Sequence, residues 1–169
     1  IKYARENKIP YLGLCYGMQL AAIEYARDVV GLEGASSTEI DENTKYPIVH
    51  DIPFDPKYQR IKGNGASMRL GAYPTILKKD SLAASIYGTT EISERHRHRY
   101  EFNNEYRKAL EDKGFVISGT SPDDFFVEMI ELSKKDHPFF LATQAHPEYK
   151  SRPLSPHPVF TAFLTASIK

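Results

Sequence analysis

The sequence predicts an α/β fold in which part of the sheet is antiparallel. An apolar run of strand length, residues 9–14, passes through a short turn into a segment whose apolar residues have helical spacing. Residues 64–100 alternate short apolar and polar groups, which favours antiparallel strands over long helices. Further strand-like runs then precede a closing segment with the period of a helix.

The first elements are expected to be a helix, a strand and a second helix. Residues 1–7 are helix-like, and residues 9–14 (IPYLGL) have the length of a strand. Apolar residues recur at helical spacing over residues 19–30, and Gly31 stands where helices often end. Cys15 therefore lies at the turn between the strand and the second helix.

The middle of the chain is expected to consist of loops and short strands. Prolines and glycines are frequent over residues 33–71, namely Pro47, Pro53, Pro56, Gly63 and Gly65. Residues 64–100 form the antiparallel region, and residues 106–113 are expected to form a short helix.

Three strands and a helix are expected to close the domain. The strand candidates are residues 115–118, 126–132 and 139–144, and the charges in the second of them favour an edge or half-exposed strand. Residues 157–168 resemble a helix. Its apolar face is expected to consist of Val159, Phe160, Phe163 and Leu164.

Length and composition point to one globular domain. The 169 residues, 41% of them hydrophobic, can bury one ordinary core. Lys+Arg and Asp+Glu both number 22, so no global field attracts nucleic acid or an anionic membrane. No apolar run approaches the roughly 20 residues that cross a bilayer, and no signal-like pattern opens the chain. An intracellular protein is expected, and its start at Ile1 suggests a piece of something longer.

Cys15 is the only cysteine and a candidate nucleophile. In Gly13-Leu14-Cys15-Tyr16-Gly17, glycines flank it at minus two and plus two, which is the nucleophile-elbow pattern with cysteine in place of serine. Side chains at the flanking positions are expected to collide, and a helix beginning just after the cysteine favours the thiolate. A lone cysteine is by default a buried structural residue, but this context favours the nucleophile.

His146 is the candidate base for such a thiolate, because cysteine nucleophiles usually act with a histidine. It follows the apolar strand at residues 139–143, and Glu148 stands two residues further on, where it can orient and stabilise an imidazolium. The alternative is a surface loop, which an isolated His-Pro-Glu more often is.

Residues 94–101 (ERHRHRYE) alternate in a way that puts three arginines on one face of a strand and two histidines on the other. The stretch invites a nucleic-acid or phosphate interpretation. The alternative is a solvated strand with Glu94 and Glu101 as salt-bridge partners. His96 and His98 give only a weak metal signal, and no metal site is expected.

Several motifs together resemble the glutaminase domain of CTP synthases. They are residues 10–19 (PYLGLCYGMQ), 68–71 (MRLG), 94–101 and 144–148 (QAHPE), the last followed by Arg152-Pro153. The cysteine elbow and His-Pro-Glu are found in class I glutamine amidotransferases generally, whereas MRLG and RHRHRYE are more specific. The resemblance implies a flavodoxin-like three-layer sandwich with a mixed central sheet and additional antiparallel strands. The resemblance extends over residues 1–169, which would form a glutaminase domain that lacks its upstream part.

The resemblance also implies an activity. Cys15, His146 and Glu148 would form a triad that hydrolyses L-glutamine to glutamate and ammonia. In similar enzymes the ammonia passes to an N-terminal synthetase domain, where ATP and Mg²⁺ activate UTP for amination to CTP in the cytoplasm. The glutaminase domain itself needs no cofactor. GTP is an allosteric activator, for which we expect residues 68–71 to contribute, and the full-length enzyme is a homotetramer.

The glutamine pocket is likewise assigned by resemblance, to Tyr16, Gly17, Met18, Gln19, Glu39 and Arg99. Glu39 and the side-chain oxygen of Gln19 can receive an α-ammonium, and the charge of Arg99 suits an α-carboxylate. Two residues depart from the usual pattern, Tyr16 in place of leucine and Ala145 in place of phenylalanine. The main-chain N–H of Tyr16 would still serve the oxyanion, with a second donor upstream of Ile1.

Other functions remain open. The chain is also compatible with an amidotransferase of another pathway, such as GMP or carbamoyl phosphate synthesis, and with a γ-glutamyl hydrolase that uses the same elbow. A different class is a non-catalytic amidotransferase-like module that binds a partner or an effector.

Overall fold

A six-stranded sheet forms the centre of the computed structural model, which describes residues 1–51 and 68–168. The expected loops around Pro53, Pro56, Gly63 and Gly65 lie outside the described residues. The strand order is β1 (Tyr11–Leu14), β9 (Phe140–Thr143), β8 (Val127–Leu132), β7 (Phe115–Thr120), β4 (Arg69–Leu77) and β5 (Glu91–His98). Strands β1 and β9 are parallel and the other neighbours are antiparallel, so the mixed sheet is confirmed.

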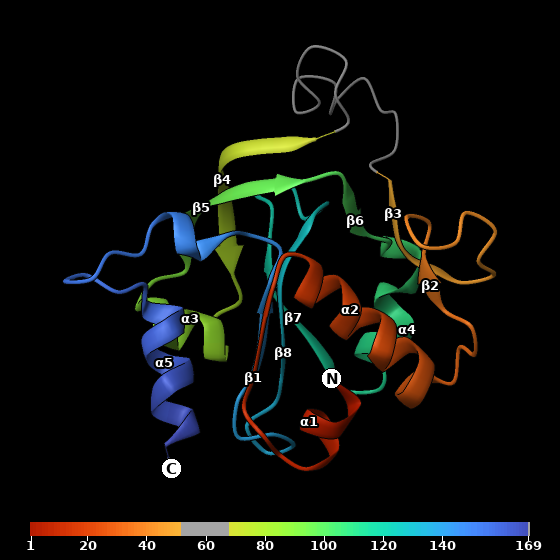
Figure 1. Ribbon diagram of the computed structural model, residues 1–169, viewed down its shortest axis with the longest axis horizontal. Helices are drawn as coiled ribbons and strands as arrows, with labels where there is room; N and C mark the ends of the chain where they lie inside the picture. The colour runs from red at the N-terminus through yellow and green to blue at the C-terminus, as the bar shows by residue number, and fades with distance from the viewer. Residues whose placement is uncertain (52–67, 169) are drawn as a thin grey trace.

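Helices cover both faces of this sheet, as Figure 1 shows. Helices α2 (Tyr16–Tyr25) and α4 (Arg107–Glu111) contribute to one hydrophobic core, with Phe115 and Ile130 of the sheet. Helices α3 (Leu82–Tyr87) and α5 (Pro158–Ser167) pack over a second core, with Met129 and Leu141. The expected three-layer sandwich is therefore confirmed.

A small second sheet lies beside the α2 layer. It consists of β2 (Ser36–Ser37), β3 (Pro47–Asp51) and β6 (Tyr100–Phe102), with β2 parallel and β6 antiparallel to β3. Strand β6 follows β5 directly in the sequence, so the chain passes from the large sheet into the small one near Arg99. Short strands joined by loops were expected in this part of the chain.

Several helix boundaries differ from the sequence prediction. Helix α2 begins at Tyr16, immediately after the elbow, and continues as a π-helix, η1 (Ala26–Val30), which ends at Gly31 with φ of 84°. Helix α1 spans Lys2–Glu6 as expected. Helix α3 was not predicted. The apolar face predicted for α5 was wrong at Leu164, which is 62% exposed, because Ala162 and Ala166 complete the buried face instead.

Strand β8 corrects a second expectation. Its charges suggested an edge strand, but it lies between β7 and β9 and is buried throughout. Glu131 accepts hydrogen bonds from the N–H groups of Leu82 and Ala83 at 2.8 and 3.0 Å, which caps helix α3. Glu128 forms ion pairs that are described with the site. Charged residues are tolerated in a core only when such partners are present.

Two shorter helical segments complete the fold. A 3-10 turn, η3 (Asn104–Tyr106), leads into α4 near the expected place, and another, η4 (Pro147–Tyr149), follows β9. Within the part of the chain that the structure describes, no helix has the length and apolar character needed to span a membrane.

Candidate active site

Cys15 occupies a strained turn between strand β1 and helix α2. Its φ of 49° and ψ of −102° are unusual for a residue with a side chain, and this is the backbone feature that a nucleophile elbow requires. The N–H of Cys15 donates to the Thr143 oxygen at 2.7 Å, which extends the parallel pairing of β1 with β9. The elbow predicted from the sequence is confirmed.

The two glycines of the elbow are not equivalent. A Cβ at Gly13 would lie 2.9 Å from both the Ala142 Cβ and the Gly17 carbonyl carbon, so a side chain cannot be accommodated there without movement. A Cβ at Gly17 would meet only the Tyr11 hydroxyl at 3.6 Å, an ordinary contact. The expected collision therefore holds for Gly13 and is wrong for Gly17.

The Cys15 thiol is the resting form in this site. Burial raises its pKa to about 11, and the carboxylates of Glu101 and Glu148 act in the same direction. Hydrogen bonds from the Tyr16 N–H and the Gln144 side chain lower the pKa only in part. The start of the helix lowers the pKa as expected, through the N–H of Tyr16, but burial outweighs this effect in the unliganded site. Reaction requires a base to remove the proton.

His146 is held in the orientation of such a base. Its Nδ1 lies 2.6 Å from the Oε1 of Glu148, and its main-chain N–H donates to the Arg95 oxygen at 2.8 Å. The other ring nitrogen, Nε2, is buried and has no hydrogen-bond partner among the described residues. A carboxylate at Nδ1 favours the proton there and leaves Nε2 as an acceptor.

A cavity of about 610 Å³ opens at Cys15. It is lined by Cys15, Tyr16, Gln19, Glu39, Ile40, Met68, Arg97, His98, Arg99 and Tyr100. The structure thus brings together Cys15 and four of the residues assigned to the glutamine pocket. Gly17 and Met18 are not among the lining residues, and the Met18 side chain is buried in the core with 1% of its surface exposed.

Gln19 offers the cavity an acceptor. Its Nε2 donates to the Tyr100 oxygen at 2.9 Å and to the Oε1 of Gln144 at 3.3 Å, so both protons of the amide group are used. The side-chain oxygen is left as the group that Gln19 can present to a ligand. Glu39 and Arg99 are both exposed and lie on the rim, where opposite charges can select the two ends of an amino acid.

The alternation predicted for residues 94–101 is confirmed. Arg95, Arg97 and Arg99 are exposed, whereas His96 and His98 are buried. The alternative, a solvated strand with salt-bridged glutamates, holds only in part, because the arginine face is exposed but Glu94 and Glu101 are buried.

Glu94 instead meets the Nε2 of His157 at 2.8 Å and the Nζ of Lys150 at 3.4 Å. Glu101 faces the interior, where Arg69 and His98 are its partners. Most of these partners come from other parts of the chain, whereas His98 lies three positions before Glu101 in the same stretch.

A buried ionic network, formed by Arg69, Glu101, Glu128, His96 and His98, lies beneath the cavity wall. Arg69 reaches Glu101 at 3.0 Å and Glu128 at 2.6 Å, His96 reaches Glu128 at 2.7 Å, and His98 reaches Glu101 at 2.7 Å. Burial alone raises the pKa of Glu128, but the charge of Arg69 and the hydrogen bond of His96 outweigh it and lower the pKa to about 2. No metal-binding cluster of three or more His, Cys, Asp or Glu is found in residues 1–51 and 68–168.

Sequence reasoning did not find this network, nor the contact of Gln144 with Cys15. Arg69 and Glu128 are separated by 59 positions, so no local pattern joins them. The signal that was available is the pair of glutamates inside the apolar run of β8, since acids in a core strand require partners.

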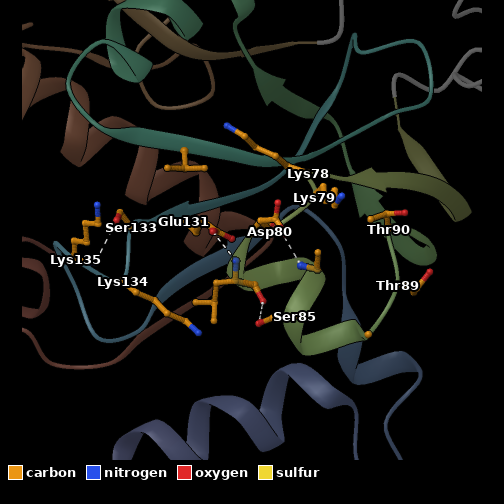
Figure 2. A pocket seen from close by; sticks show the side chains of 15 residues that line it. Lys78, Lys79, Asp80, Ser85, Thr89, Thr90, Glu131, Ser133, Lys134 and Lys135 are labelled. Carbon is orange, nitrogen blue, oxygen red and sulfur yellow. Dashed lines mark hydrogen bonds between the residues drawn. The ribbon is translucent and has the colours of Figure 1, made fainter.

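A second cavity of about 710 Å³ lies beside α3. Lys78, Lys79, Lys134 and Lys135 are among its lining residues, together with Glu131. Figure 2 shows that the lysine side chains point in different directions, whereas the Glu131 carboxylate is engaged at the start of the helix. These lysines are exposed, and the lining residues of this cavity include no cysteine or histidine.

The family model described as glutamine amidotransferase class-I matches residues 1–166, and the chain belongs to this family. Its sequence is 58% identical over 168 residues to the CTP synthase of Methanocaldococcus jannaschii, a match that covers 99% of this chain and 30% of that protein. The resemblance to CTP synthases is therefore confirmed. The chain spans about 30% of the length of the curated relatives it matches.

Solved structures agree with this assignment. The glutaminase domain of Trypanosoma brucei CTPS with bound acivicin matches with a TM-score of 0.88 and 38% identity, over 99% of this chain and 63% of that chain. A protein from Thermoplasma acidophilum described as a GMP synthase subunit matches with a TM-score of 0.59 and 21% identity, over 99% of this chain and 61% of that chain. The second likeness concerns the fold alone.

Proposed function

We propose that this chain is the glutaminase part of a CTP synthase and hydrolyses L-glutamine to glutamate and ammonia. One observation carries the proposal. Cys15 stands at a strained elbow that opens into a cavity, and the chain holds His146 by a carboxylate at one ring nitrogen while the other is free to accept a proton. The identity with CTP synthases over nearly the whole chain supports the choice of pathway over GMP or carbamoyl phosphate synthesis.

The reaction begins with transfer of the Cys15 proton to Nε2 of His146. The sulfur attacks the side-chain carbonyl carbon of glutamine, and the developing oxyanion is stabilised by the N–H of Tyr16 at the start of α2. The imidazolium, stabilised by Glu148, then protonates the departing nitrogen and ammonia leaves. Water, deprotonated by the same histidine, hydrolyses the glutamyl thioester and restores the thiol. The chemistry of these residues requires no cofactor.

Substrate orientation follows from the charges on the cavity wall. The oxygen of Gln19 and the carboxylate of Glu39 receive the α-ammonium of glutamine, while Arg99 attracts its α-carboxylate. This arrangement directs the side-chain amide toward Cys15. Tyr16, which is 47% exposed, narrows the entrance and contributes its main chain to the oxyanion.

The remaining steps belong to the longer relatives. We infer that the ammonia passes to an N-terminal synthetase domain that uses ATP and Mg²⁺ to convert UTP into CTP, in a cytoplasmic homotetramer. GTP would stimulate hydrolysis through residues 68–71. Leu70 is 64% exposed, whereas Arg69 is 1% exposed and ion-paired, so Leu70 rather than the Arg69 guanidinium is the group available to a ligand.

The deciding experiment is ammonia release from glutamine, with and without GTP, by this chain extended upstream of Ile1, because the family places the second oxyanion donor there. Cys15→Ser is the matched control. Release that depends on Cys15 and rises with GTP supports the proposal. A folded sample without release would favour a module that binds a partner or an effector, and Leu70→Ala with full GTP stimulation would contradict the role of residues 68–71.

A further inference from the structure

Gln144 is a buried side chain in contact with the reacting sulfur. It follows β9 directly, and because β9 pairs in parallel with β1, it stands beside Cys15. None of its surface is exposed, and its N–H donates to the Glu128 oxygen at 2.9 Å. Its side-chain Nε2 lies 3.6 Å from the Cys15 Sγ.

The orientation of the Gln144 amide is determined by its neighbours. The Tyr100 carbonyl can only accept, so the end of Gln19 that faces it must be the amino group. The same nitrogen of Gln19 lies 3.3 Å from the Oε1 of Gln144, which must therefore be the acceptor end. The amino group of Gln144 is left facing the sulfur, and this conclusion does not depend on distinguishing nitrogen from oxygen at either side chain.

We propose that Gln144 is a further catalytic residue, whose amide donates a hydrogen bond to the Cys15 sulfur and stabilises the thiolate, and that Gln19 is a positioning residue acting through it. The proposal rests on the glutaminase function proposed above. An amide nitrogen cannot accept a proton, so the thiol hydrogen is directed away from Gln144 and toward another acceptor. Transfer of that proton to His146 then leaves a sulfur that already has a donor.

The size of the effect follows from the charge on the acceptor. Hydrogen bonds to ionised groups are roughly twice as strong as neutral ones, so the nitrogen-to-sulfur contact of 3.6 Å stabilises the thiolate more than the thiol. Loss of the donor is therefore expected to lower the thiolate fraction about tenfold, which is one pKa unit.

The test measures how fast iodoacetamide alkylates Cys15 as a function of pH, together with the ultraviolet absorbance of the thiolate. Cys15 is the only cysteine of the chain, so both signals report one group once a Cys15→Ser blank is subtracted. Gln144→Met, which keeps the length of the side chain without the donor, is expected to react about tenfold more slowly at a given pH. Gln144→Glu should shift the titration further upward, because its carboxylate repels the thiolate.

Two variants separate catalysis from structure. Gln19→Met leaves Gln144 in place but removes the partner that fixes its orientation, so a smaller upward shift is expected. Thr143→Val is the matched control: Thr143 is equally buried and its hydroxyl accepts a bond from the Ala145 N–H, so loss of thermal stability without a shift is expected. If folded Gln144→Met gave the same Cys15 titration curve as the wild type, the proposal would be overturned. If neither Gln144 variant folds, an unshifted Cys15 titration in Gln19→Met would overturn it.

The same measurements keep this proposal distinct from the proposed function. Alkylation needs no glutamine, so a shifted titration in a chain that releases no ammonia would support the role of Gln144 at the sulfur and contradict the glutaminase. Normal ammonia release by Gln144→Met, with kcat and its pH profile unchanged, would leave the glutaminase intact and overturn the role of Gln144.

Discussion

The cavity beside Cys15 and the cavity beside α3 are similar in volume, about 610 and 710 Å³, but their polar side chains are held differently. At Cys15 the side chains of Gln19 and Gln144 are buried and form a chain of hydrogen bonds that ends at the sulfur. At α3 the lysines are exposed and diverge, as Figure 2 shows. The larger cavity, beside α3, is therefore the one whose polar side chains have no fixed arrangement.

A fixed arrangement of polar side chains indicates where a reaction can take place. A buried polar group costs free energy unless it is bonded, so a chain that retains several of them around one atom has a fixed geometry there. An exposed lysine costs little and keeps its conformational freedom. Fixed geometry, rather than volume, distinguishes the candidate active site.

Replacement of Glu148, the partner of the His146 imidazole, is expected to reduce activity most. Glu148→Gln should reduce ammonia release by about two to four orders of magnitude, because an amide can donate to Nδ1 and so favour the wrong tautomer of His146. The measurement is kcat for glutamine hydrolysis. Tyr149→Phe, beside the same imidazole, is the control and should retain most of the activity. A loss below tenfold in Glu148→Gln would contradict the triad.

The next effect concerns stability beneath the Cys15 cavity. Arg69→Met should lower the free energy of unfolding by about 3–5 kcal/mol, because it leaves Glu101 and Glu128 buried without their cation. Denaturant unfolding monitored by circular dichroism measures it. A change below about 1 kcal/mol would show that the network does not hold the wall of the site.

A pH dependence follows from the same network. The pKa of Glu128 is lowered from 4.5 to about 2, so its ionised form stabilises the folded chain above about pH 4.5. That contribution should be lost as the pH falls from there toward 2. Thermal unfolding across this interval, compared with Glu128→Gln, measures it. An equal acid dependence in the variant would assign the loss to other carboxylates.

The smallest effect is expected in the cavity beside α3. Lys134→Ala and Lys135→Ala together should change stability by less than about 0.5 kcal/mol and leave glutamine hydrolysis unchanged, because both side chains are exposed. Denaturant unfolding measures the stability, and ammonia release from glutamine measures the activity. A large loss of activity would show that this cavity contributes to function.

Local patterns indicated the candidate catalytic residues, but they did not indicate the side chains that support them. The elbow is encoded in five adjacent residues, and His146 and Glu148 stand two apart, so contiguous sequence contains their geometry. Gln144 was seen only as part of a motif, because its contact with Cys15 depends on the pairing of β1 with β9. The ion pairs of Arg69 join distant strands and leave no periodic signal.

In the fold, too, local patterns were informative, whereas contacts between distant segments were not foreseen. The class of fold and most elements followed from apolar spacing, with the remainder of the architecture implied by resemblance. Strand β8 was assigned wrongly to an edge because its glutamates suggested water, while their actual partners are the start of α3 and the cation of Arg69. Leu164 was misplaced for a related reason, since small alanines rather than a large residue complete the buried face of α5.

The parallel pairing of β1 with β9 also has a consequence for the order of events during synthesis. Cys15 belongs to an early segment, whereas Gln144 and His146, its proposed amide donor and base, belong to a segment translated much later, and a contact of such sequence separation closes slowly. A nascent chain therefore carries Cys15 before Gln144 can pack beside it. Under the proposed function, glutamine hydrolysis would begin only once the late strand has docked beside the early one.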